Sequence, residues 1–304
     1  MLPASIQVLQ RGWLSSNGIL LAGREGVTLV DSGYGDHAPQ TLALLDHALA
    51  GRPLARLVNT HCHSDHIGGN RAVQARHGCR TTIPAGEAPL IDAWDEEALI
   101  LGFADQRAER FGYDDTLAAG EVVRMGEHEW QAIAAPAHDP HALMFWSPEE
   151  RVLIAGDALW EDGFGVIFPA LFGDTHALAQ TRATLDTIAR LAPRAVIPGH
   201  GAAFDRVVPA LERAYGRLEG FERDLSRHAR HAVKVMIVFA LLQKRRMPIA
   251  TLPAYCASIG ILQRINREFL GLTPEAMAAW LVEDLVRARA VAQEDGDLVP
   301  LIAA

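Results

Sequence analysis

The seven residues from Thr60 to His66 constrain the fold of this chain more than any other stretch. They read Thr-His-Cys-His-Ser-Asp-His and place three imidazoles and one carboxylate in six consecutive positions, directly after an apolar segment at 55–59. Borderline-soft divalent metals bind these nitrogen and oxygen donors. Side chains two positions apart share a face of an extended segment, so His61 and His63 can bind one ion together.

Asp65 and His66 indicate a second ion. They fall where the chain bends towards a helix expected at 67–73, so they point in a different direction from His61 and His63. A surface loop that is merely rich in histidine is the other interpretation of this run, and the number of metal-binding side chain types disfavours it.

The run resembles the HxHxDH motif of the metallo-β-lactamase superfamily, and four other segments match landmarks of that family. They are Asp-Ser-Gly at 31–33, Pro-Ala-His at 136–138, Gly-Asp at 156–157 and Pro-Gly-His at 198–200. Together they span roughly residues 5 to 204. The resemblance implies an α/β fold, a four-layer αββα sandwich in which two facing sheets carry helices on their outer faces.

The resemblance also implies two metal ions and a ligand set for each. The ligands are His61, His63 and His138 for one ion, Asp65, His66 and His200 for the other, and Asp157 as the bridge. Two such ions can share a metal-bridging hydroxide and polarise a scissile carbonyl. Asp65 is the expected catalytic residue, as a proton shuttle for the leaving group, or else a ligand alone. We expect two divalent ions, zinc by default, although iron or manganese would accept the same ligands.

Short apolar runs bounded by Gly, Pro and Asp predict strands throughout the first 200 residues. These strands are expected at 5–10, 18–22, 27–31, 57–60, 81–84, 122–125, 129–135, 142–147, 151–157 and 195–198. Helical patterns lie between them at 39–50, 70–77 and 177–192. The long connection at about 86–121 is predicted to be a helical insertion in the catalytic domain, which spans 1–204. It is either a lid or substrate wall, or a structural elaboration.

The remaining residues, 205–304, predict a mainly helical C-terminal module. Helices are expected at 207–230, 231–245, 249–258 and 274–292, followed by a hairpin around Asp295-Gly296. This pattern resembles the winged-helix module that follows the catalytic core in some hydrolases of the metallo-β-lactamase fold. The segment 274–292 carries three acidic residues against two arginines, which disfavours DNA binding. Packing, dimerisation or pocket-building are the favoured roles of the module.

Charge and composition restrict the partners and the location of the protein. Residues 1–204 carry 14 arginines, no lysine and 25 acidic residues, and such a surface repels a nucleic acid backbone. The three cysteines show no paired spacing, no secretory leader is readable, and no uncharged apolar run is long enough to span a membrane. We therefore expect a cytoplasmic protein with a small-molecule substrate and no nucleic acid or membrane partner, and a homodimer is one option.

The segment after Asp157 bears on the substrate. It resembles glyoxalase II-like hydrolases in position and glycine content but lacks their Cys-Gly-Arg element. Trp160, Phe164 and Phe168 suggest an apolar wall near the metals, although Phe168 could instead cover the core. A metal-dependent hydrolase of a thioester or ester with an apolar acyl part is therefore expected. The alternatives are an acyl-homoserine-lactone-type lactonase, an endoribonuclease of the same fold, and a non-enzymatic signalling protein that retains its metals. His141 follows His138 by three positions and is expected outside direct coordination.

Overall fold

The structure, a computed structural model, describes residues 2–302 and contains two large sheets that face each other. The strand order is β1-β2-β3-β4-β5-β6 in the first sheet and β11-β10-β9-β8-β7 in the second. The strands of the first sheet are β1 (Ile6–Leu9), β2 (Gly18–Gly23), β3 (Gly26–Val30), β4 (Leu54–Val58), β5 (Arg80–Pro84) and β6 (Asp115–Leu117). Those of the second are β7 (Val122–Met125), β8 (His128–Ala134), β9 (Leu143–Ser147), β10 (Val152–Gly156) and β11 (Ala195–Pro198). The apolar runs predicted ten of these strands, whereas β6 lies in the segment expected to be helical.

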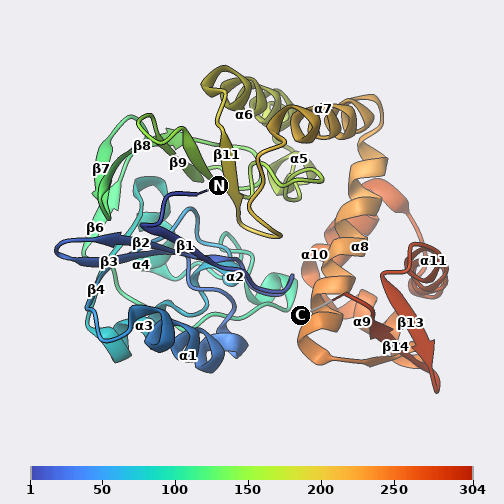
Figure 1. The fold of residues 1–304 in the computed structure, drawn as a ribbon. Coiled ribbons are helices and arrows are strands. Elements are labelled where there is room, and N and C mark those ends of the chain that lie inside the picture. Colours follow the sequence, from blue (N-terminus) through green and yellow to red (C-terminus); the bar gives the residue numbers. More distant parts are fainter. Residues whose placement is uncertain (1, 303–304) are drawn as a thin grey trace.

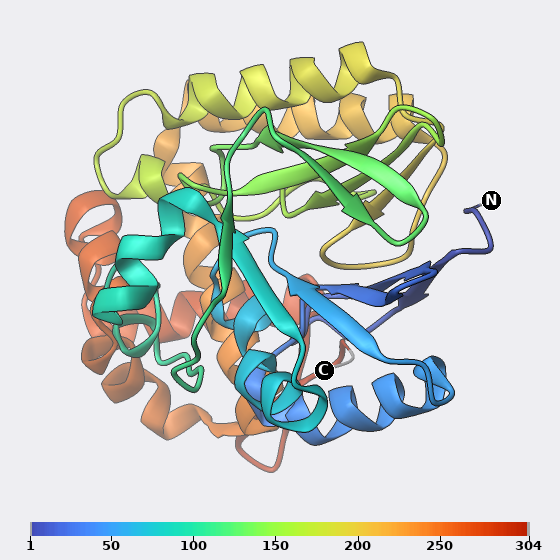
Figure 2. The ribbon, with the colours of Figure 1, turned by 90° about the vertical axis from the view of Figure 1, so that its left-hand side faces the viewer.

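Helices cover the outer face of each sheet (Figures 1 and 2). Apolar side chains from both sheets form one buried core between them. The helices α1 (Ala38–Leu49) and α3 (Asn70–His77) lie on the first sheet, and α6 (Ala177–Leu191) and α7 (Val207–Arg223) lie on the second. Trp130 and Phe145 of the second sheet are fully buried against the first sheet. The predicted four-layer αββα sandwich is therefore confirmed.

The C-terminal elements form a helical module that carries its own small sheet, in the order β12-β14-β13. Its helices are α8 (Leu225–Lys244), α9 (Leu252–Ser258), α10 (Gly260–Ile265), the π-helix η5 (Asn266–Leu270) and α11 (Pro274–Arg287). Its strands are β12 (Met247–Pro248), β13 (Val291–Glu294) and β14 (Asp297–Pro300). Asp295 and Gly296 both have positive φ, 51° and 86°, as a two-residue type I′ turn requires. The hairpin predicted at Asp-Gly is confirmed.

Two helix boundaries in this region differ from the sequence expectation. The chain breaks at Asp224 rather than near 230, because Asp224 is extended and its carboxylate accepts the Ser226 N–H at 2.9 Å as the N-cap of α8. The helix α10 was not expected, and the last helix ends at Arg287 rather than at 292. Among the described residues, none of the helices has the length and apolarity that a membrane span needs.

The module packs against two segments that precede it in the chain. The insertion contains α4 (Ala88–Ala93) and η3 (Gly102–Ala104), and the chain after β10 forms the short helix α5 (Phe168–Leu171). Residues of η3 and α5 share one hydrophobic core with α8 and α10. In Figure 2 the insertion, in teal, lies beside the orange and red C-terminal elements. This arrangement brings the C-terminal module close to one side of the site described next.

Candidate metal centre

The structure brings all seven predicted ligands together at one edge of the sandwich. They belong to loops that follow β4, β8, β10 and β11, and to the one-turn helix α2 (Ser64–Ile67). They form two groups, His61, His63 and His138 in one, and Asp65, His66, Asp157 and His200 in the other. In each group the possible ligand atoms lie within 4.8 Å of one another. The extended backbone at His63 and the start of α2 explain why the run 61–66 supplies both groups.

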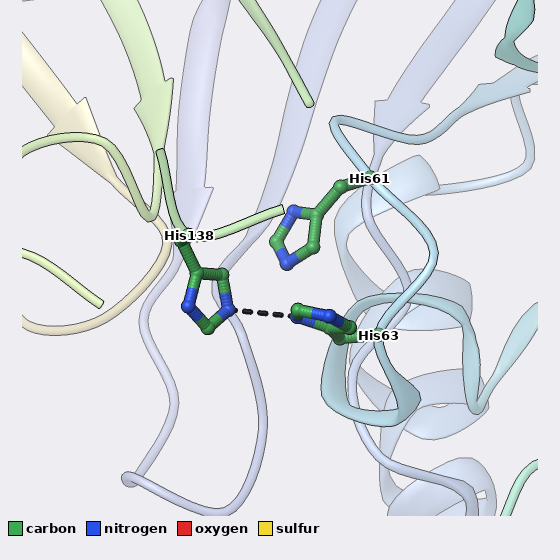
Figure 3. Close-up of side chains that lie close together, drawn as sticks. All are labelled: His61, His63 and His138. Carbon is green, nitrogen blue, oxygen red and sulfur yellow. Dashed lines mark hydrogen bonds between the residues drawn. The ribbon is translucent and has the colours of Figure 1, made fainter. Parts of the chain in front are cut away.

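The first group is a triangle of imidazoles (Figure 3). The ring centroids of His61 and His63 are 4.7 Å apart, and those of His63 and His138 are 4.4 Å apart. The His63 Nδ1 atom lies 2.7 Å from the His138 Nε2 atom. Three ring nitrogens that converge in this way provide the donor set of a transition metal ion.

The carboxylate of Asp157 lies between the two groups. Its Oδ2 atom is 3.5 Å from His138 Nε2, and its Oδ1 atom is 3.5 Å from His66 Nε2 and 3.9 Å from His200 Nε2. Asp65 completes the second group, because its Oδ2 atom lies 3.0 Å from His200 Nε2. One oxygen of Asp157 therefore faces each group, as a bridging ligand requires.

The protonation states of His61, His63, Asp65 and Asp157 fit divalent cations. His66 has to release a proton to bind one: its burial lowers its pKa, but Asp31 and Asp157 raise it well above the usual value. Burial, together with the neighbouring histidines His66 and His63, holds the pKa of His61 well below its usual value, and burial and His138 lower the pKa of His63 to about 4. Burial opposes ionisation of Asp65 and Asp157, yet His66 and His200 hold the pKa of both carboxyls below the usual range. Neutral imidazoles and ionised carboxylates are the forms that bind metals.

Two buried ring nitrogens also fit a metal. The Nε2 atoms of His61 and His66 are buried and have no hydrogen-bond partner among the described residues. An unpaired buried nitrogen is costly unless something binds it. In each imidazole the other nitrogen is occupied: His61 Nδ1 lies 3.0 Å from Thr60 Oγ1, and His66 Nδ1 lies 2.8 Å from Asp31 Oδ2. The free nitrogens are therefore the ones available to ions.

A second layer of contacts orients these ligands. Asp31 directly follows β3 and has a φ of 59°. Its carboxylate accepts hydrogen bonds from the Thr60 N–H at 2.9 Å and from the Thr60 hydroxyl at 2.8 Å, and it also faces His66. His138 donates its Nδ1–H to the Val166 carbonyl at 2.5 Å. Such contacts fix the ring orientation and the tautomer of a ligating histidine. The Asp-x-Gly landmark at 31–33 therefore supports the site rather than entering it.

Sequence reasoning missed Asp139 and Glu87. Asp139 is buried, and its Oδ2 atom lies 3.6 Å from the Nε2 atom of His63. Burial, followed by the Asp139 carboxylate, raises the pKa of Glu87 to about 10, so Glu87 is protonated at neutral pH. The position of Asp139 directly after His138 could have indicated that it lies near the metal centre. No motif around Glu87 indicates such a position. His141 is exposed, and its ring packs on Gly86, outside the cluster.

Of the three aromatic residues predicted to form an apolar wall, two contact the metal ligands and one lies in the core. The Phe168 ring centroid is 5.5 Å from that of His138, and Trp160 donates its indole N–H to Asp157 Oδ1 at 3.2 Å. The prediction that Phe164 forms part of this wall is wrong. Phe164 is buried in the core against Phe221, because α7 covers it. Trp13 was not predicted at all and stacks on the His200 ring at 5.5 Å.

Comparisons with known proteins support the same interpretation. A family model described as the metallo-beta-lactamase superfamily matches residues 11–200. Hydroxyacylglutathione hydrolase of Rhodospirillum rubrum is 30% identical over 123 residues, which are 40% of this chain and 41% of that protein. The same enzyme of Rhizobium etli is 26% identical over 149 residues, 49% of this chain and 51% of that protein. The chain thus aligns with about two fifths to one half of the length of these relatives.

Solved structures share the fold over almost the whole chain. A metallo-beta-lactamase family protein of Thermus thermophilus is 20% identical, with a TM-score of 0.58, and the match covers 98% of this chain and 99% of that one. A beta-lactamase domain protein of Burkholderia ambifaria is 21% identical, with a TM-score of 0.57, and the match covers 100% and 94%. The chain belongs to the metallo-beta-lactamase superfamily.

Proposed function

We propose that this protein is a dinuclear metal-dependent hydrolase of a thioester or ester with an apolar acyl part. The position of Asp157 supports this proposal most strongly, because one of its oxygens faces each ligand group. Two divalent ions bound there would supply a nucleophile from water at neutral pH and would polarise the substrate carbonyl. Zinc is the proposed metal, since the ligands are histidine and aspartate.

Asp65 is the proposed catalytic residue. Its carboxylate is buried, is held ionised by His66 and His200, and lies at the edge of the second group. In this position it can receive a proton during attack and deliver it to the departing thiol or alcohol. Asp157 would hold the two ions at a fixed separation.

The surroundings of the site favour a carbonyl substrate with an apolar part. A cavity of about 530 Å³ opens beside His63 and His138, a size typical of small-molecule sites, and Phe168 is one of its aromatic walls. The relatives named as hydroxyacylglutathione hydrolases act on a thioester, which supports the same reaction class. Residues 1–204 contain no lysine, so we propose an acyl group other than one carried by glutathione.

We also propose a cytoplasmic location. Cys62, Cys79 and Cys256 are all buried and unpaired, and free thiols are usual in a reducing compartment.

The reaction class can be tested on protein purified without chelator. Elemental analysis should give close to two transition metal ions per chain. A panel of thioesters, esters, an acyl-homoserine lactone and RNA should show hydrolysis of the carbonyl substrates, with thioesters or esters ahead. Asp65→Asn should lower kcat by roughly 10²–10⁴ while it retains both ions. Faster cleavage of RNA than of any carbonyl substrate would refute the proposal, as would a single ion after supplementation with metal.

A further inference from the structure

The cavity beside the metal centre is lined by four parts of the molecule. Its lining includes residues of the metal face, of α5, of the insertion and of the C-terminal helix α10. Among the lining residues are His138, Phe168, Phe172, Phe103 and Arg264. The C-terminal module is thus a wall of the cavity as well as a packing partner.

One side of the cavity is a continuous series of rings that leads away from the metal centre. The Phe168 ring lies 5.5 Å from His138, and the Phe172 ring stacks on Phe168 at 6.1 Å with an interplanar angle of 22°. The guanidinium carbon of Arg264 lies 4.5 Å from the centroid of Phe172. An apolar path therefore begins at His138 and ends at Arg264.

Arg264 is held in place at that end. Its Nη2–H donates to the Phe172 carbonyl at 3.2 Å, and its Nε lies 3.5 Å from the carboxylate of Glu268. The charge of the guanidinium is therefore balanced within the protein, and its flat face covers the aromatic ring. These contacts suit an end wall better than a receptor for a free anion.

The opposite side comes from the insertion, and the C-terminal module fixes it. Phe103 lies 6.2 Å from Phe172 and packs directly on Gly260, where a Cβ atom would come within 2.5 Å of the Phe103 ring. Asp105 accepts a hydrogen bond from the Tyr255 hydroxyl at 2.8 Å and pairs with Lys244 at 2.8 Å. The insertion is thus attached to the C-terminal helices at Phe103 and at Asp105.

The carboxylates near the cavity are largely engaged in local turns. Asp95 Oδ1 accepts the N–H of Ala98 at 3.0 Å, and Asp174 Oδ1 accepts the N–H of His176 at 2.8 Å. Both residues are exposed, so they lie at the rim in contact with water. A charged rim around an apolar interior selects an uncharged chain and excludes an acidic one.

We propose that this cavity binds the acyl chain of the substrate and that Arg264 and Phe103 limit the length of that chain. The inference rests on the proposed function and makes it specific. Short to medium straight chains or arylalkyl groups fit between the metals and Arg264, and long fatty acyl chains extend past the wall. Arg264 and Phe103 are specificity-determining residues contributed by the C-terminal module and the insertion.

The test is a series of thioesters of one small thiol, from acetyl to palmitoyl. For the unmodified protein, kcat/KM should rise roughly fourfold per methylene until the cavity is full, and should then fall. Arg264→Ala and Phe103→Ala should each move the optimum to longer chains by at least two methylenes. Arg264→Met keeps the bulk without the charge, so it should keep the original optimum. Arg230→Ala is the matched control, because Arg230 is an exposed residue of α8 and is absent from the cavity lining.

A second measurement separates this inference from the proposed function. Calorimetry with straight-chain fatty acids and the metal-loaded protein should show an affinity that increases up to the same chain length. In Arg264→Ala and Phe103→Ala the chain length of tightest binding should increase. If neither thioesters nor esters are hydrolysed but the fatty acids show this limit in chain length, the proposed reaction is wrong and the acyl pocket is still supported. If folded, metal-loaded Arg264→Ala and Phe103→Ala both keep the optimal acyl chain length of the unmodified protein, the proposed acyl pocket is wrong. Preference for acyl chains that end in a carboxylate, lost in Arg264→Met, would also overturn it, because Arg264 would then bind an anion.

Discussion

His138 and His141 stand three positions apart, yet only His138 joins the metal cluster. His138 follows β8 after Pro136 and the small Ala137, whereas His141 is exposed and lies against Gly86. Replacing His138 by Ala should therefore remove the ion shared with His61 and His63 and nearly all activity. The matched change His141→Ala should retain both ions and lose less than the roughly 10- to 100-fold typical of residues that orient a ligand. Metal analysis and kcat on both variants decide this, and loss of an ion from His141→Ala would contradict it.

Glu87 gives a second prediction at the scale of single residues. Burial and Asp139 raise its pKa from 4.5 to about 10, so the folded chain keeps a proton that the unfolded chain releases. The unfolded state then binds fewer protons between these pH values, and stability falls as the pH rises from about 4.5 to about 10. Glu87→Gln is neutral at every pH, so its Tm without metal should exceed that of the unmodified protein at about pH 9, with a gap that closes towards about pH 5. Parallel Tm curves for the two proteins would show that Glu87 is ionised in the fold.

At the scale of elements, glycines allow the loops to converge on the metals. A Cβ atom at Gly199, between β11 and His200, would lie 2.2 Å from Asp157 Oδ1. Gly199→Ala should therefore displace the bridging carboxylate and reduce the metal content to one ion or none. Gly216 lies within α7 and has open space around it, so Gly216→Ala should keep both ions and gain stability, by up to about 1 kcal/mol. Two retained ions in Gly199→Ala would show that Asp157 is not confined by this turn.

The sequence predicted elements best where one local signal determined them. The apolar runs located β3 and β11, and the run 60–66 together with the later landmarks located every residue of the cluster. The break at Asp224 was missed because helical periodicity continues on both sides, and only the cap marks the end of α7. Glu87 and Arg264 could not be found from the sequence. They acquire their surroundings from packing between segments that are distant along the chain.

At the scale of the whole molecule, the C-terminal module is connected to the metal centre through one short stretch of backbone. His138 donates to the Val166 carbonyl, and the next carbonyl, that of Ile167, lies 3.0 Å from the Nε2 atom of His228 on α8. His228 is fully buried and stacks near Phe221, with ring centroids 4.4 Å apart. The loop that orients a proposed ligand is thus held from the other side by the module.

This connection predicts how the protein responds to acid. Burial lowers the pKa of His228 from 6.5 to about 4, so between these values the unfolded chain binds a proton that the folded chain does not. Stability contributed by the neutral ring is present above about pH 6.5 and is lost as the pH falls towards about 4, by roughly 3 kcal/mol at most.

The variant His228→Gln tests this, because its side chain can still donate a hydrogen bond to the Ile167 carbonyl but does not titrate. The difference in unfolding free energy between the two proteins, measured with urea at several pH values, should change by a few kcal/mol across this window. Because the metal ligands are the same in both proteins, their titration cancels in the difference. A difference that stays constant from about pH 7 to about pH 4 would show that acid acts on the metal centre or elsewhere, and not on the contact between α8 and the Ile167 carbonyl.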